Sequence, residues 1–384
     1  MNNELKNNPL FSLGFRPFFL AGSFFSFIIM LLWLLIQFGY FYLPYSSIIW
    51  HSHEMIFGFT GAIITGFLLT ASANWAGIPG VRGNSLKILL SVWLAGRLLF
   101  PFCQNNFIFS IIDLSYFPLV IYFLMPYLGK IEQRKNQIFF IFLGLMFFGN
   151  LLVHLDISGI FPGWAMKGIY LGLNTIIMII VTISGRVFPF FVKKAVKGSI
   201  VNSYKIIEIS CIGVTGLFLI AELIKQNTLF SAIIAVFASL AHFIRLLGWR
   251  PWQTRKTPIL WILFIGYLWL VIGFFLKSIS YFFFLPSGIS THAWTTGVLG
   301  ILIYGMITRV SLGHTGRVIE ASRIIVIGYI LLNLTVIIRA IIPLIMPAQY
   351  FNAIIVSGIL WSAAYLIFIL QYWKILTRPR VDIT

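Results

Sequence analysis

The side chains of this chain best suited to hold a cofactor are its histidines, of which there are only six. They are His51, His53, His154, His242, His292 and His314. Neutral imidazole is the side chain most used to bind haem iron and copper. At membrane depth an ionisable residue costs about 2.5–3.5 kcal/mol near a helix centre, and it usually marks a functional site. All six are therefore candidate metal ligands if the chain lies in a membrane.

The stretch Trp50-His51-Ser52-His53-Glu54-Met55 is the most informative. On an α-helix, residues two apart point about 200° away from each other. His51 and His53 therefore cannot readily ligate one ion from a regular helix, but they can hold two cofactors on opposite sides of it. Glu54 falls on the same side as His51, where its carboxylate can relay protons as a catalytic group or tune a ligand. The alternative is that Glu54 pairs with a nearby arginine.

Other charged residues within apolar segments are weaker candidates for a site. Arg97 and Arg339 carry the planar guanidinium that suits the propionates of a haem, so both are candidate cofactor-binding residues. The alternative is that either arginine pairs with Asp113. Asp113, Asp156 and Glu222 lie near the ends of apolar runs, where carboxylates can admit protons.

Composition identifies the solvent that surrounds these residues. Of 384 residues, 60% are hydrophobic and 9% are charged, and the mean hydropathy is +0.98. A soluble domain carries about a quarter charged residues. We therefore expect an all-α membrane protein. The two cysteines show no CxxC spacing, which argues against a disulfide framework or a thiolate metal site.

Apolar runs long enough for a bilayer of about 20 residues per helix divide the chain into twelve predicted spans. They lie near residues 18–38, 47–70, 86–103, 107–128, 138–155, 166–185, 205–224, 229–248, 259–277, 290–309, 322–343 and 350–373. The connectors are too short to bury a soluble core, so residues 1–384 are expected to form a single transmembrane domain. The polar start of the chain is followed directly by an apolar run, which predicts a retained first helix rather than a cleaved signal.

Lysine and arginine fall in every second connector and near both ends of the chain. Under the positive-inside rule this pattern predicts an inner-membrane protein with both termini in the cytoplasm. The net charge of +18 is explained by these connectors. No basic helix or aromatic-basic module is present, which argues against nucleic acid as a partner.

The predicted topology sorts the histidines by depth. His51 and His53 open the second span, His154 closes the fifth and His292 opens the tenth, so all four lie near the outer face. Four imidazoles at one depth favour a metal or haem site over isolated hydrogen-bonding histidines. His242 lies toward the inner half of the eighth span, and His314 lies just inside after the tenth.

A weak internal repeat accompanies these positions. The second and tenth spans each begin with a histidine, and the sixth and tenth end in similar short sequences, Ile183–Val187 and Ile307–Ser311. A spacing of four helices is consistent with three arcs of four helices each.

Short motifs rich in glycine, arginine and aromatic residues run in order from residue 14 to residue 317. They are Gly14-Phe15-Arg16-Pro17-Phe18-Phe19; Trp50-His51-Ser52-His53-Glu54-Met55 with Gly58-Phe59; Gly66-Phe67-Leu68-Leu69-Thr70 with Asn74-Trp75; Gly185-Arg186 with Pro189-Phe190-Phe191; Gly266-Tyr267 with Trp269; and Thr308-Arg309-Val310-Ser311-Leu312-Gly313-His314-Thr315-Gly316-Arg317. In these motifs the chain resembles the NnrS family. The chain departs from the family at Phe264, where members often carry histidine.

The resemblance implies a bacterial membrane protein that contains haem and copper and is linked to nitric oxide metabolism and nitrosative stress. The leading hypothesis is an oxidoreductase that reduces nitric oxide to nitrous oxide at a haem or haem–metal site near the outer face. Two b-type haems are expected on His51 and His53, with His154 and His292 completing an axial position or a copper site, and with Glu54 handling protons. Quinol or another partner would donate electrons.

Two other functions remain open from the sequence. One is a non-enzymatic haem protein that binds or senses nitric oxide. The other is a transporter, although no clear repeat of six plus six spans is visible.

Overall fold

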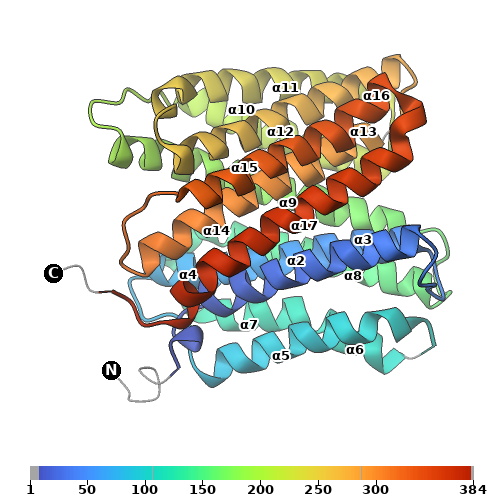
Figure 1. The fold of residues 1–384 in the computed structure, drawn as a ribbon, viewed down its shortest axis with the longest axis horizontal. Helices are drawn as coiled ribbons and strands as arrows, with labels where there is room; N and C mark the ends of the chain where they lie inside the picture. Colours follow the sequence, from blue (N-terminus) through green and yellow to red (C-terminus); the bar gives the residue numbers. More distant parts are fainter. Residues whose placement is uncertain (1–7, 106, 287, 382–384) are drawn as a thin grey trace. The chain divides into compact units, whose positions relative to one another are not determined.

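The computed structural model describes residues 8–105, 107–286 and 288–381 of the chain (Figure 1). The protein is 82% helical, and its described residues contain no strand. Within these described ranges twelve helices are long and apolar enough to cross a membrane, which confirms the predicted all-α class and the number of spans.

The spans are formed by continuous or interrupted helices. In chain order they are α2 (Phe15–Gln37); α3, η2 and α4 (Ser47–His53, Glu54–Thr60, Gly61–Ala76); α5 and η3 (Asn84–Leu99, Phe100–Asn105); α6 and α7 (Phe107–Leu114, Tyr116–Leu128); α8 (Ile138–Ile157); α9 (Ala165–Ala195); α10 (Lys205–Ile224); α11 (Leu229–Gly248); α12 (Pro258–Phe282); α13, η6 and α14 (Gly288–His292, Ala293–Gly300, Ile301–His314); α15, η7 and α16 (Arg323–Val336, Ile337–Ile341, Ile342–Ile345); and α17 (Tyr350–Thr377). A short 3₁₀ turn precedes the first span at Pro9–Phe11, and others lie between later helices, at Ile131–Asn136, Pro251–Thr254 and Pro347–Gln349.

One predicted boundary differs clearly from the structure. The sixth span was expected to end near residue 185, before the first of several basic residues. Helix α9 instead continues to Ala195 and passes through Pro189. Apolar composition marks where a span leaves the lipid, whereas a helix continues as long as its backbone hydrogen bonds are satisfied. Arg186 therefore lies on a helix rather than in a connector.

The helices form two compact units. Unit 1 comprises the residues up to Thr175, together with Gly313–Arg317 and the residues from Phe368 on. Unit 2 comprises Ile176–Leu312 and Val318–Ile367.

The second span forms the core of unit 1. Helix α4 packs against α2 and α7, and most of the span is buried. Gly66 permits the close approach of α2, since a Cβ atom at Gly66 would lie only 2.8 Å from the Cβ of Phe18. Protein interiors tolerate little overlap of this kind.

Replacing Gly66 with valine should therefore destabilise the protein by about 1–3 kcal/mol, because the added side chain overpacks the contact between α4 and α2. The matched control is Gly144→Val in α8, where a Cβ atom meets nothing within 4 Å. Thermal unfolding in detergent measures the difference. Equal midpoints for the two variants would contradict this account of the packing.

The tenth span has the same role in unit 2. It is mostly buried and packs against α12 through η6 and α13. Both central spans are interrupted by a π-helix, at Glu54–Thr60 in unit 1 and at Ala293–Gly300 in unit 2. Such π-turns are rare and are frequently found at functional sites.

The start of α2 and the end of α17 meet within unit 1. Arg16 donates from Nη1 to the carbonyl oxygens of Leu376 and Arg378, at 2.9 and 2.7 Å. The amide of Val381 donates to the carbonyl of Thr315 at 3.0 Å. Both helix ends therefore lie at the same end of unit 1, and the predicted cytoplasmic orientation of that end stays a prediction.

Candidate metal centre

A cluster of six buried polar side chains lies inside unit 1. Its members are His53 of α3, Glu54 of η2, Arg97 of α5, Asp113 of α6, and Asn150 and His154 of α8. None of them is more than 6% exposed. We refer to these six residues as the unit 1 cluster. Because buried charges are costly, such a group persists only when its members satisfy one another or a ligand.

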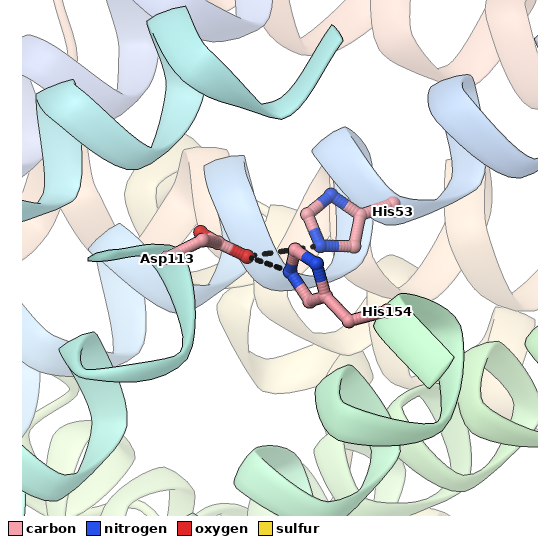
Figure 2. Close-up of side chains that lie close together, drawn as sticks. All are labelled: His53, Asp113 and His154. Carbon is pink, nitrogen blue, oxygen red and sulfur yellow. Dashed lines mark hydrogen bonds and ion pairs between the residues drawn. The ribbon is translucent and has the colours of Figure 1, made fainter. Parts of the chain in front are cut away.

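Two histidines and one carboxylate converge at the centre of this cluster (Figure 2). Oδ2 of Asp113 lies 2.8 Å from Nε2 of His154 and 3.3 Å from Nε2 of His53. The candidate ligand atoms of the three residues all lie within 4.8 Å of one another. A set of two histidines and one carboxylate is typical of non-haem iron sites, and imidazole also suits copper and zinc.

The second nitrogen of His53 fixes the orientation of its ring. Nδ1 of His53 lies 3.0 Å from Oε1 of Glu54, so it donates its proton to that carboxylate. Nε2 faces the side-chain oxygen of Asn150 at 2.6 Å and Oδ2 of Asp113. A histidine that ligates a metal almost always donates its other N–H to such a partner. The arrangement thus turns Nε2 toward a place where a cation is favoured.

Arg97 joins the two carboxylates of the cluster. It donates from Nη1 to Oε2 of Glu54 at 3.1 Å and from Nη2 to Oδ1 of Asp113. Asn150 donates to the other oxygen of Asp113 at 2.9 Å. With neutral imidazoles, the two carboxylates and one guanidinium leave the cluster with a net negative charge. A bound cation would neutralise it.

Two glycines make room for these ion pairs. A Cβ atom at Gly58 would lie 2.8 Å from Nη1 of Arg97 and 3.0 Å from Oε2 of Glu54. A Cβ atom at Gly96 would lie 2.6 Å from Oδ1 of Asp113. The π-helix that begins at Glu54 contains Gly58. The local sequence is therefore matched to the cluster and not only to helix packing.

Aromatic rings close the cluster on one side. The ring of Phe100 stacks on His53 with centroids 3.5 Å apart and planes 6° apart. Tyr45 donates its hydroxyl to the carbonyl of Phe100 at 3.1 Å. Burial and the nearby charge of Glu54 raise the pKa of Tyr45 above its usual range, so this phenol stays a donor.

The structure brings together four of the residues selected from the sequence: His53, Glu54, Arg97 and His154. The alternative that Arg97 pairs with Asp113 is confirmed. Helical spacing predicted Glu54 on the side of His51, and its carboxylate bonds to His53 and Arg97. The alternative that Glu54 pairs with a nearby arginine is therefore confirmed.

The structure places the other candidates away from the unit 1 cluster. His51 stacks on Trp33 with centroids 4.3 Å apart, on another side of its helix. His314 lies in unit 1 with its ring centroid 5.5 Å from that of Phe15. His292 and Arg339 belong to unit 2.

His242 is part of a separate network in unit 2. Its Nδ1 lies 2.7 Å from the hydroxyl of Tyr267 and its Nε2 lies 2.9 Å from the hydroxyl of Thr215. Arg245 donates to the same tyrosine hydroxyl at 3.0 Å and pairs with Glu208. Since hydroxyl groups satisfy both ring nitrogens, this geometry favours the hydrogen-bonding role for His242 that the sequence left open.

Two functional residues were not assigned as ligands or supports from the sequence. Asp113 was given only a role in proton entry or in an ion pair, and Asn150 was not selected at all. Asn150 precedes His154 by four residues, so the two share a face of α8, and this spacing was a usable signal. Nothing in the sequence indicated that α6 would face α8.

Comparison with known protein families gives one match. The family profile described as NnrS protein matches residues 9–380. The chain belongs to the NnrS family. This family is linked to the response to nitric oxide and is a metal-binding family. The match covers every residue of the unit 1 cluster, and no curated protein matches the chain.

The donor set of the cluster fits a metal ion. Metal–nitrogen bonds of about 2.0–2.1 Å place the ligands of one ion roughly 3 Å apart, close to the separations found here. Nδ1 of His154 has no hydrogen-bond partner among the described residues, so the hydrogen bond of this ring is made through Nε2.

A porphyrin does not fit at the same place. An axial ligand must point its nitrogen at an open plane, whereas Nε2 of His53 faces Asn150 at 2.6 Å and the face of its ring is covered by Phe100. The unit 1 cluster is thus suited to a single ion and not to haem.

Proposed function

We propose that the protein removes nitric oxide at a redox-active metal ion, copper or iron, held by His53, Asp113 and His154. The observation that carries this proposal is the buried convergence of two imidazole nitrogens and one carboxylate oxygen in a cluster of net negative charge. Membership of the NnrS family supplies the link to nitric oxide.

The reaction we propose is the reduction of two nitric oxide molecules, with two protons and two electrons, to nitrous oxide and water. The ion would bind nitric oxide and exchange electrons with it. Asp113 would offer Oδ2 to the ion, while Arg97 holds its other oxygen in place. Glu54 orients His53 through Nδ1 and is the carboxylate closest to that ring, where it is suited to hold a proton for the reaction.

The burial of the site suits this substrate. Members of the cluster are almost inaccessible to water, whereas nitric oxide is small, neutral and soluble in lipid. It can therefore reach the site from the bilayer, and charged competitors are excluded. Quinol, which is also lipid-soluble, is the proposed source of electrons, and the bacterial inner membrane is the proposed location.

The first experiment is metal analysis, with an absorption spectrum in oxidised and dithionite-reduced forms, on protein purified in detergent. His53→Ala and His154→Ala should each lose the metal and the consumption of nitric oxide under reducing conditions. His51→Ala is the matched control, since it removes an imidazole two residues from His53 that stacks on Trp33 outside the cluster. It should retain the metal.

Two results would overturn the proposal. Retention of metal by both His53→Ala and His154→Ala would place the centre elsewhere. A wild-type protein that contains metal but consumes no more nitric oxide than its metal content would instead be a binding or sensing protein. Haem absorbance that is lost only in variants outside the cluster would identify a second, separate cofactor.

A further inference from the structure

The central spans of the two units carry the same pattern of residues. His53 is followed by glycine after five, eight and thirteen positions, at Gly58, Gly61 and Gly66. His292 is followed by glycine at the same three intervals, at Gly297, Gly300 and Gly305. In both spans a π-helix begins at the residue after the histidine.

These glycines also meet equivalent neighbours within their own units. At Gly66 an added Cβ would touch Phe18 and Phe19 of α2, and at Gly305 it would touch Ile262 and Leu263 of α12. The same shift of 244 residues relates Phe18 to Ile262 and Phe19 to Leu263. Helices α2 and α4 therefore pack together as α12 and α14 do.

Three further contacts follow the same correspondence. They are Gly22 against Ala62 and Ile63, matched by Gly266 against Ile301 and Leu302; Gly58 against Phe25, matched by Gly297 against Trp269; and Gly61 against Phe117, matched by Gly300 against Trp361. Four independent close contacts at constant shifts are not expected by chance. The first four spans thus share an architecture with the last four.

The correspondence extends to an arginine. Arg97 is followed by proline after four residues, at Pro101, and Arg339 is followed by proline at the same interval, at Pro343. Arg339 lies in η7, the third π-helix of the described chain. The segment that ends in His292, α13, packs against η7. Unit 2 therefore repeats the pairing of a histidine segment with an arginine segment.

Both carboxylates of the unit 1 cluster are missing from the repeat. The shift that relates His53 to His292 places Ala293 where unit 1 has Glu54. The shift that relates Phe117 to Trp361 places Ser357 where unit 1 has Asp113. In the parts of the chain that the structure describes, no ion pair joins Arg339 to a carboxylate.

Arg339 and His292 each have a hydroxyl group within 3.5 Å. Nη2 of Arg339 lies 3.5 Å from the hydroxyl of Tyr350, and its guanidinium lies 5.2 Å from the ring centroid. The hydroxyl of Thr295 lies 3.4 Å from Nδ1 of His292. A guanidinium in a membrane span with hydroxyl neighbours and no carboxylate carries uncompensated positive charge, which favours an anionic ligand.

We propose that His292 and Arg339 form a second ligand site, in unit 2, which binds a planar monoanion with two oxygens on one atom. The guanidinium is planar and presents paired N–H donors that match such an anion in a bidentate manner. Nitrite and carboxylates share this shape. The repeat thus supplies a cation site where its carboxylates are present and an anion site where they are replaced by Ala293 and Ser357. This inference does not depend on the proposed function.

The test is calorimetric titration of sodium nitrite, and separately of sodium acetate, into detergent-purified protein. Nitrite is expected to bind, and Arg339→Gln should weaken the binding by about tenfold or more, because a charged hydrogen-bonding group is lost. Arg323→Gln, at the exposed start of α15, is the matched control and should bind as the wild type does. The metal content of Arg339→Gln should be unchanged, which separates this site from the unit 1 cluster.

The two anions distinguish the sources of the ligand. Binding of nitrite alone would support a site for a free inorganic anion, and binding of both would support a site for the carboxylate of an organic molecule. If neither nitrite nor acetate bound to the protein, the proposal would be overturned. Equal nitrite binding by the wild type and Arg339→Gln would overturn it as well. If Arg339→Gln fails to fold, His292→Gln should give the same tenfold loss.

Discussion

Asp113→Asn should remove the metal from the protein, although the volume of the side chain at this position hardly changes. The substitution takes away the charged oxygen that would ligate the ion and that now accepts from His154 and Asn150. Changes at groups that only support metal ligands cost about 10–100-fold in affinity, so loss of a ligand should cost at least about 100-fold. Metal content after purification and after dialysis against the candidate ion measures this loss, and nitric oxide consumption should fall with it.

Asp156→Asn is the matched control for this substitution. Asp156 belongs to the same unit and accepts from the amide of Ala165 at 2.6 Å, where α9 begins. Loss of such a helix cap costs about 1 kcal/mol of stability. Metal content should stay at the wild-type level. If the Asp113→Asn variant kept its metal, the metal centre would not use this carboxylate as a ligand.

The sequence was sufficient for the class and the number of helices. A run of apolar residues marks a span regardless of its neighbours, because lipid imposes the same requirement on each helix. The same reasoning failed at the end of α9. There the helix continues through Arg186 and Pro189 after the apolar run has ended.

The candidate site was predictable only in part. His53 and His154 were selected because an imidazole in an apolar span is unusual wherever it lies. The role of Asp113 depends on α6 facing α8, and no pattern within one helix reports which other helix it faces. Helical spacing could not show that Glu54 bonds to Arg97, because Arg97 belongs to another span.

The repeat between the first four and the last four spans was also only partly predictable from the sequence. The sequence indicated that the second and tenth spans both begin with a histidine. The equivalence of Phe117 and Trp361 emerged only from the contacts of Gly61 and Gly300. The repeated unit is four spans rather than six, so it adds no support to the transporter hypothesis, for which a repeat of six plus six was the expected sign.

Arg97→Met should give the largest loss of stability in the metal-free protein. The variant leaves Glu54 and Asp113 buried with no guanidinium between them. Breaking a buried ion pair by removing one partner costs about 3–5 kcal/mol. The loss of one positive charge favours the binding of a cation, whereas the loss of the bond that holds Asp113 in place disfavours it. We expect the effect of charge to be the larger, because the cluster is buried and its charges are poorly screened. Thermal unfolding with and without added metal measures both effects.

Added metal should therefore stabilise Arg97→Met more than it stabilises the wild type, since ligand binding to the folded state stabilises it in proportion to the logarithm of affinity. Arg82→Met is the matched control, because Arg82 is exposed in the same unit and forms no ion pair with any described residue. It should match the wild type in both measurements. If metal stabilised Arg97→Met no more than Arg82→Met, the net charge of the cluster would not govern cation binding. The role of Arg97 would then be to hold Asp113 in place.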